Sequence, residues 1–154
     1  GNGWVGCDLG HRHWGRHGAA GLLIADHGRG DQTRVLLQHR AAWTANGDTW
    51  GIPGGARDSH ESATEAALRE TVEECGVDTA LITVRGELIT ADLEGWSYTT
   101  VLASAPEPLA VQANEESEEL RWVPLDELDD LKLHPGFAAS LPQVIAALGP
   151  AWGA

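Results

Sequence analysis

Several residue types and patterns are scarce in this chain of 154 residues, and their scarcity excludes whole classes of protein. The two cysteines, Cys7 and Cys75, are too few for a disulfide framework and lack the paired spacing of a zinc site. The longest apolar stretch runs from Gly18 to Ala25, far short of the roughly 20 residues that a membrane-spanning helix needs. No basic and then apolar signal segment opens the chain. We therefore expect no membrane partner and no secretion, and a reducing, cytoplasmic location fits.

Basic residues are also scarce, with 10 lysines and arginines against 23 aspartates and glutamates and a formal net charge of -13. A field of this sign repels polyanions, so we expect no nucleic acid polymer among the partners. The length suffices for one sizeable hydrophobic core but hardly for two. We predict one domain at residues 18–154, preceded by an N-terminal arm of uncertain order at residues 1–17, where neither helical nor strand periodicity is present.

The order of apolar patterns predicts strands interleaved with a few helices. Branched apolar runs predict a pair of strands at 19–25 and 34–39, and further strands at 49–52, 82–90, 96–105 and 120–123. Asp58 followed by Glu61 resembles a capping box, which would open a helix that stops at Gly76. Helical segments are also predicted at 125–131 and 137–148. This order indicates an α/β sandwich.

The predicted helix before Gly76 has one apolar face and one acidic face. The apolar stripe consists of Leu68, Val72 and Cys75. The glutamates on the other side lie within an arc of about 100° and are Glu70, Glu73 and Glu74. A solvated surface is the simple interpretation of such acids, but their spacing costs about 0.2 to 0.5 kcal/mol for each like-charged pair. The negative end of the helix dipole disfavours them further, by about 0.3 to 1 kcal/mol near the last turn.

Two local rules broken together usually mark a functional site. Hard divalent cations would supply the missing compensation here, because Mg²⁺ and Mn²⁺ prefer carboxylate and carbonyl oxygens. The acidic face therefore predicts a metal site.

From Gly55 to Val77 the sequence GARDSHESATEAALRETVEECGV resembles the Nudix box. The positions that match its pattern are Gly55, Glu61, Arg69, Glu70, Glu73, Glu74, Gly76 and Val77. Thr71 stands where the family prefers an aliphatic residue, and we expect this to affect packing more than chemistry. A chance match at the chain's own residue frequencies is on the order of one in a hundred thousand. The TWGIPGG and LRWVPLDEL segments are also similar to the family, so the resemblance extends from about Gly18 onward.

The resemblance implies roles for the residues of the box and the glycine before it. Glu73 and Glu74 are expected metal ligands, the Gly54 carbonyl is a further one, and Glu70 is either a ligand or the base that orients and deprotonates the attacking water. Arg69 is expected to orient the neighbouring carboxylate.

The remaining box residues are expected to be structural. Glu61 either anchors the loop, as the resemblance implies, or caps the helix, as its local pattern indicates. Glycines at Gly54 and Gly55 allow the backbone to approach a metal or an anion closely, and Gly76 ends the helix.

Residues outside the box are expected to complete the site. Many family members take one more carboxylate from a loop before the last strand, for which we choose Glu116, with a solvated acidic loop as the alternative. Arg40 and Arg57 are the basic residues nearest to the loop in sequence and are candidates for substrate phosphates. Aromatic side chains that could stack on a base are Trp43, Trp50, Trp96 and Tyr98.

The resemblance implies a Nudix-type α/β/α sandwich with a mixed sheet, and a MutT-like hydrolase that uses Mg²⁺ or Mn²⁺. Its expected substrate is a small nucleotide, namely a nucleoside diphosphate linked to another moiety. Cleavage at an internal phosphoanhydride is expected, with a nucleoside triphosphate as the leading substrate. The alternative is a non-catalytic Nudix nucleotide-binding or regulatory module, in which we would expect losses among the box residues, and none is lost. The oligomeric state stays open, with a homodimer as one option.

Overall fold

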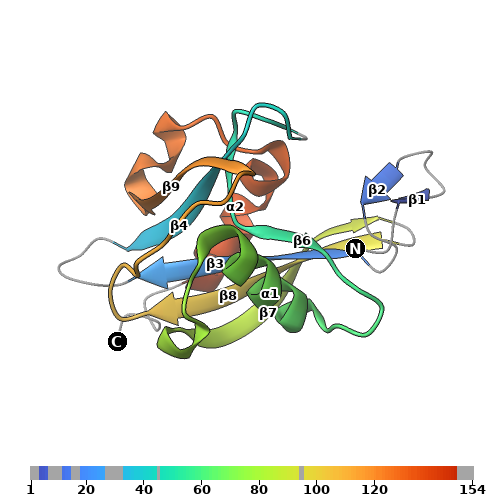
Figure 1. The fold of residues 1–154 in the computed structure, drawn as a ribbon, viewed down its shortest axis with the longest axis horizontal. Helices are drawn as coiled ribbons and strands as arrows, with labels where there is room; N and C mark the ends of the chain where they lie inside the picture. The colour runs from blue at the N-terminus through green and yellow to red at the C-terminus, as the bar shows by residue number, and fades with distance from the viewer. Residues whose placement is uncertain are drawn as a thin grey trace.

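Strand β3 (Ala19–Asp26) is the central element of the fold, and each of its residues is buried. A strand covered on both faces has a continuous apolar sequence, as AAGLLIA has here. In this computed structural model, which describes residues 4–6, 12–14, 18–26, 33–44, 46–93 and 96–148, β3 pairs in parallel with β8 (Trp96–Ala105). It pairs antiparallel with β4 (Arg34–Arg40) and β6 (Gly54–Ala56). The sheet is therefore mixed (Figure 1).

The other strands extend this sheet on both sides of β3. The order β5-β4-β3-β8-β7 places β5 (Trp50–Gly51) at one edge and β7 (Thr83–Leu93) at the other, while β9 (Ser117–Pro124) pairs antiparallel with β4. The strands predicted at 19–25, 34–39, 49–52, 82–90, 96–105 and 120–123 are all present, with ends that differ by a few residues.

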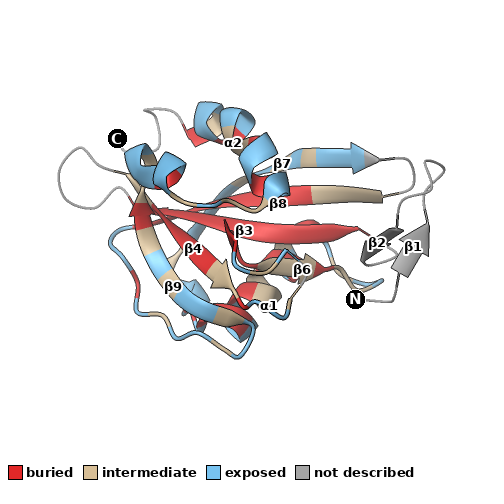
Figure 2. Cartoon of the chain, turned by 90° about the horizontal axis from the view of Figure 1, so that it is seen from above, coloured by how far each residue is buried: buried red, intermediate tan, exposed pale blue. Residues whose placement is uncertain are grey.

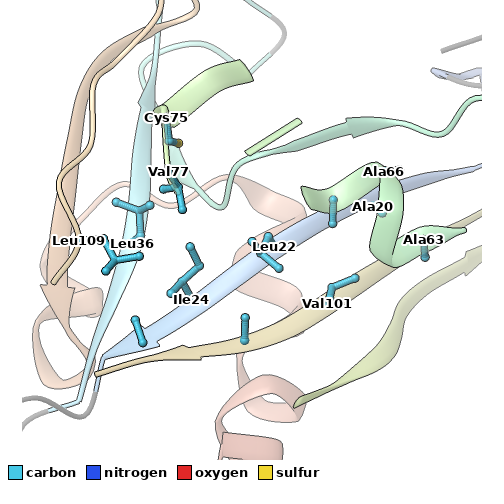
Figure 3. Packing of buried hydrophobic residues seen from close by; sticks show 13 residues of the cluster. Ala20, Leu22, Ile24, Leu36, Ala63, Ala66, Cys75, Val77, Val101 and Leu109 are labelled. Carbon is cyan, nitrogen blue, oxygen red and sulfur yellow. The ribbon is translucent and has the colours of Figure 1, made fainter. Parts of the chain in front are cut away.

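Two helices, α1 (Ala63–Cys75) and α2 (Pro135–Leu148), cover opposite faces of the sheet, as Figure 2 shows. Leu22 and Ile24 of β3 point toward the α1 side, where they form one core cluster with Ala66 (Figure 3). Leu23 points to the other side and packs in a second cluster with Phe137 of α2. These two cores on one sheet confirm the predicted α/β/α sandwich in a single domain.

The start of α1 differs from the prediction, whereas its end agrees with it. Ser62 is the N-cap, and its hydroxyl and the Glu65 side chain form the capping box. The capping box predicted at Asp58 and Glu61 is therefore wrong. These two residues form a turn that precedes the helix, and the Glu61 carboxylate accepts a hydrogen bond from Arg69 of the helix. Gly76 ends the helix in the left-handed region with a φ of 66°, which a glycine adopts without strain.

The buried face of α1 also differs from the predicted apolar stripe. Val72 is 45% exposed, whereas Thr71 and Glu74 face the interior. Small alanines allow this orientation, since Ala63, Ala66 and Ala67 bring the helix close to β3. The Thr71 hydroxyl donates a 2.7 Å hydrogen bond to the Ala67 carbonyl, so its burial leaves no polar group unsatisfied. Thr71 is thus a packing residue, as its departure from the box pattern led us to expect.

The remaining segments bring smaller corrections. The helical segment predicted at 125–131 is a 3-10 helix, η2 (Leu125–Asp130), and a second short 3-10 helix, η1 (Thr79–Leu81), follows α1. In α2, Val144 is buried, whereas the apolar side chain of the next residue, Ile145, is 46% exposed. The predicted arm contains an antiparallel pair of short strands, β1 (Trp4–Gly6) and β2 (Arg12–Trp14), although no strand was predicted there.

The other residues of 1–17, and residues 94 and 95, lie outside the described residues. Within the described part of the chain, no helix is long and apolar enough to cross a membrane.

Candidate active site

A cavity of about 890 Å³ brings the predicted acidic face together with aromatic side chains. Its acidic lining consists of Glu70, Glu73 and Glu74 from α1 and Glu116 from the loop before β9. Its aromatic lining consists of Trp96 and Tyr98 from β8 and Phe137 from α2. Segments from four parts of the sequence therefore meet at this cavity.

Glu74 is the most deeply buried acid of the cavity, with 3% of its surface exposed. The Gln38 amide donates to its Oε1 at 3.0 Å, and the Gly54 N–H donates to its Oε2 at 3.2 Å. Burial raises the pKa of Glu74 to about 8, and the nearby charges of Glu70 and Glu116 act in the same direction. Without a cation, Glu74 therefore holds its proton near neutral pH.

Arg69 links the loop before α1 to the acidic face. Its Nε and Nη2 donate to the two carboxylate oxygens of Glu61, at 2.6 and 2.8 Å, which is the bidentate geometry of a strong ion pair. Its Nη1 donates to Glu70 Oε1 at 2.9 Å. The hydrogen bond from Arg69 lowers the pKa of Glu61 to about 2 and raises that of Arg69 itself. Glu61 thus anchors the loop, and Arg69 fixes the direction of the Glu70 side chain.

Glu70 is half-buried and lines the cavity. Burial raises the pKa of Glu70, which the charge and hydrogen bond of Arg69 partly offset. The backbone of β6 approaches this carboxyl group so closely that a Cβ at Gly55 would lie 2.6 Å from its carboxyl carbon. A Cβ at Gly54 would lie 2.5 Å from the Ala20 carbonyl oxygen. At both positions the backbone lies so close to its neighbours that only glycine, which has no Cβ, fits.

The donors of this cavity fit a hard divalent cation in their chemistry. They are carboxylates beside a glycine backbone. Their negative charges repel one another, and a bound cation would relieve this repulsion. No three His, Cys, Asp or Glu side chains among the described residues already lie close enough together to hold an ion. Glu73 has 56% of its side chain exposed, and Glu116 is also exposed. Glu73 is held by an ion pair with Arg69 at 3.6 Å, and both side chains are exposed enough to turn toward an ion.

Of the two arginines predicted to bind phosphates, one lines the cavity and the other does not. Arg40 lines the cavity. Arg57 does not, and its Nη2 instead donates to the Glu61 carbonyl at 2.9 Å. Arg57 is therefore a brace of the loop before α1.

Of the four aromatic residues predicted to stack on a base, two line the cavity and two do not. Trp96 and Tyr98 line the cavity, whereas Trp43 is 70% exposed and outside it. Trp50 is buried, with its ring stacked on His39 at 4.7 Å between centroids.

Sequence reasoning missed further residues of the lining, chiefly Phe137, His134 and Asn46. His134 Nδ1 accepts the Gly136 N–H at 3.0 Å, and its Nε2 lies 3.3 Å from the Asn46 amide. Burial lowers the pKa of His134, so its ring is neutral near pH 7. Asn46 and Asp48 have positive φ angles of 55° and 61°, a conformation that asparagine and aspartate tolerate better than most residues, and these residue types are a local signal for this loop.

The chain is similar to known proteins along most of its length. A family model described as the NUDIX domain matches residues 15–147. A relative from Mycobacterium tuberculosis, provisionally named 8-oxo-dGTP diphosphatase 3, is 52% identical over 145 residues, which are 91% of this chain and 67% of that protein. A nucleoside triphosphate pyrophosphatase/Nudix hydrolase fusion protein from Bifidobacterium longum is 43% identical over 159 residues, and the match covers 96% of this chain and 33% of that protein.

A solved structure is similar along nearly the whole chain. The crystal structure of RenU, a Nudix hydrolase from M. smegmatis, is 50% identical, covers 97% of this chain and 98% of its own, and superposes with a TM-score of 0.91. The chain belongs to the Nudix family. Within that family it is a pyrophosphohydrolase, the class to which the names of its relatives point.

Proposed function

We propose that this protein hydrolyses an internal phosphoanhydride of a nucleoside triphosphate and releases a nucleoside monophosphate and pyrophosphate. The observation that carries the proposal is one cavity with an acidic lining from α1 and an aromatic lining from β8 and α2. Acids suit a metal-bound diphosphate, and aromatic rings suit a base. The name of the relative from M. tuberculosis, which refers to a nucleoside triphosphate, favours this substrate class.

Enzymes of the family generally use divalent cations, and Mg²⁺ or Mn²⁺ is the proposed cofactor here. Its proposed ligands are Glu73, Glu74, Glu116 and the Gly54 carbonyl. Such an ion would neutralise phosphoryl oxygens and lower the pKa of a bound water. Without it the acidic lining would repel the substrate, so activity should depend strictly on metal.

Glu70 is the proposed group that orients the attacking water and accepts its proton. Two features support this role: burial raises its pKa, and the 2.9 Å hydrogen bond from Arg69 fixes its direction. A carboxylate with a raised pKa is a better proton acceptor than a solvated one. Gly55 belongs to the same arrangement, because only a residue without a Cβ leaves space for this carboxyl group.

The substrate is held by the remainder of the lining. Trp96 and Tyr98 are proposed to contact the base, and Arg40 is proposed to contact the phosphates. The name of the M. tuberculosis relative makes 8-oxo-dGTP a first probe, beside the ordinary nucleoside triphosphates.

The test is an analysis of products from nucleoside triphosphates, nucleotide sugars and dinucleoside polyphosphates, each with Mg²⁺ or Mn²⁺. We expect a monophosphate and pyrophosphate from a triphosphate, and no turnover in a chelator. Failure of every compound with every metal would favour the alternative, a non-catalytic nucleotide-binding module. Release of orthophosphate alone would refute internal cleavage.

A further inference from the structure

The last turn of α1 is completed by a distant segment of the chain. The final carbonyls of a helix have no partner within it, and α1 has no basic residue in its last turn. The Gly76 N–H donates to the Val72 carbonyl at 3.0 Å, as expected for a helix end. The Cys75 carbonyl instead accepts the N–H of Gln112 at 2.8 Å, from the segment that leads into β9.

Asn114 satisfies two more of these carbonyls. Its N–H donates to the Glu74 carbonyl, and its side-chain Nδ2 donates to the Glu73 carbonyl, both at 3.3 Å. Asn114 therefore contacts the backbone of the two glutamates that are the proposed metal ligands on α1.

The other end of the Asn114 side chain holds the backbone of Glu116. Its Oδ1 accepts the Glu116 N–H at 3.0 Å, which is an Asx turn. Its carbonyl accepts the Ser117 N–H at 3.2 Å. One residue thus connects the carboxyl end of α1 to the loop that carries the accessory carboxylate.

Gln38 makes a second connection between the same two segments. It is 1% exposed, and its Nε2 donates to Glu74 Oε1 at 3.0 Å and to Ser117 Oγ at 2.7 Å. Its buried Oε1 finds no hydrogen-bond partner among the described residues, and leaving a buried polar atom unpaired costs free energy. A buried amide kept at that cost indicates that the position of its Nε2 matters. The links at Asn114 and Ser117 lie on either side of Glu116.

We propose that Asn114 is a positioning residue, which fixes Glu116 beside the glutamates of α1 so that it joins the divalent-metal site. The inference rests on the proposed function only in taking Glu116 as a ligand. Without the Asn114 side chain, the Glu116 backbone would keep the hydrogen bond from the Ala41 N–H to its carbonyl, at 2.9 Å, but would lose the one at its own N–H. The less restrained, exposed Glu116 would then have to be ordered when the ion binds, and this entropy cost would appear as weaker metal affinity. Partners that orient metal ligands typically contribute about 10- to 100-fold in affinity.

The test measures binding of Mn²⁺ alone to the whole chain, with no nucleotide, by the loss of the free Mn²⁺ electron paramagnetic resonance signal. We expect Asn114→Ala to weaken binding about tenfold. Asn114→Ser should weaken it less, because a serine hydroxyl makes the same turn more weakly. Gln112→Ala is the matched control, since Gln112 contacts α1 through its backbone N–H, and it should keep the wild-type affinity.

A double-mutant cycle separates positioning from a general loss of stability. If Asn114 acts through Glu116, the double variant Asn114→Ala with Glu116→Gln should bind Mn²⁺ as Glu116→Gln alone does. Unchanged affinity in Asn114→Ala, or losses that add fully in the double variant, would overturn the proposal. Should Asn114→Ala not fold, the same cycle is run with Asn114→Ser and the same two outcomes decide. Mn²⁺ binding without turnover of any nucleotide would refute the proposed function and leave this proposal intact.

Discussion

Replacing Glu74 by glutamine is expected to remove a pH dependence from the stability of the metal-free protein. Burial raises the pKa of Glu74 to about 8 in the folded chain, against the ordinary pKa of 4.5 that a glutamate has when the chain is unfolded. Between these two pKa values the folded state binds one more proton at Glu74 than the unfolded state does. The free energy of unfolding therefore falls by about 1.4 kcal/mol for each pH unit as the pH rises through this window.

The effect is large enough to measure by urea unfolding in a chelator. From about pH 5 to about pH 7, the wild type should lose about 3 kcal/mol more stability than Glu74→Gln. Glu70, whose pKa burial also raises, adds a slope of the same sign that both proteins share. Glutamine cannot accept both hydrogen bonds that the two carboxylate oxygens of Glu74 accept, so the absolute stability will also change. The two proteins are therefore compared by the slope of their unfolding free energy against pH.

A matched control removes a negative charge elsewhere. Glu118→Gln changes an exposed glutamate that does not line the cavity, and it should keep the wild-type slope. Parallel stability curves for wild type and Glu74→Gln would refute the reasoning that burial holds a proton on Glu74.

Three further predictions concern the metal and the water. Mg²⁺ or Mn²⁺ should raise the melting temperature measured by differential scanning fluorimetry, and the combined change of Glu73→Gln and Glu74→Gln should abolish that gain; an equal gain in this variant would move the metal elsewhere. Glu70→Gln should lower kcat by at least about a hundredfold while substrate affinity is largely kept, and unchanged turnover would reassign the base. Gly55→Ala should reduce kcat because its Cβ would displace the Glu70 carboxyl group, and wild-type kinetics would show that this contact is not required.

Helix α1 shows which features could be predicted from the sequence and which could not. Gly76 and the three glutamates could be predicted because a left-handed end and a crowded acidic arc are local features. The burial of Thr71 and the exposure of Val72 could not, because the face of α1 that meets β3 is decided by how closely its small alanines allow the helix to approach.

The outer parts of the cavity were hard to predict for a related reason. His134 and Asn46 are 88 residues apart in the chain, and no periodic pattern relates one loop to another. The link from Asn114 to the carboxyl end of α1 likewise depends on the sheet, which brings β9 and its preceding loop back to the helix. Arg40 and Arg57 were equal candidates by sequence, and only the fold distinguishes the one that lines the cavity.

The position of bond cleavage tests the central claim most directly. Hydrolysis of a nucleoside triphosphate in ¹⁸O-labelled water with Mg²⁺ should give a monophosphate and pyrophosphate, with the label in one of these two products. This outcome is predicted because the acidic lining would hold metal and water against an internal diphosphate, where attack breaks a bridging bond. Label found only in free orthophosphate, with a nucleoside diphosphate as the other product, would contradict the account.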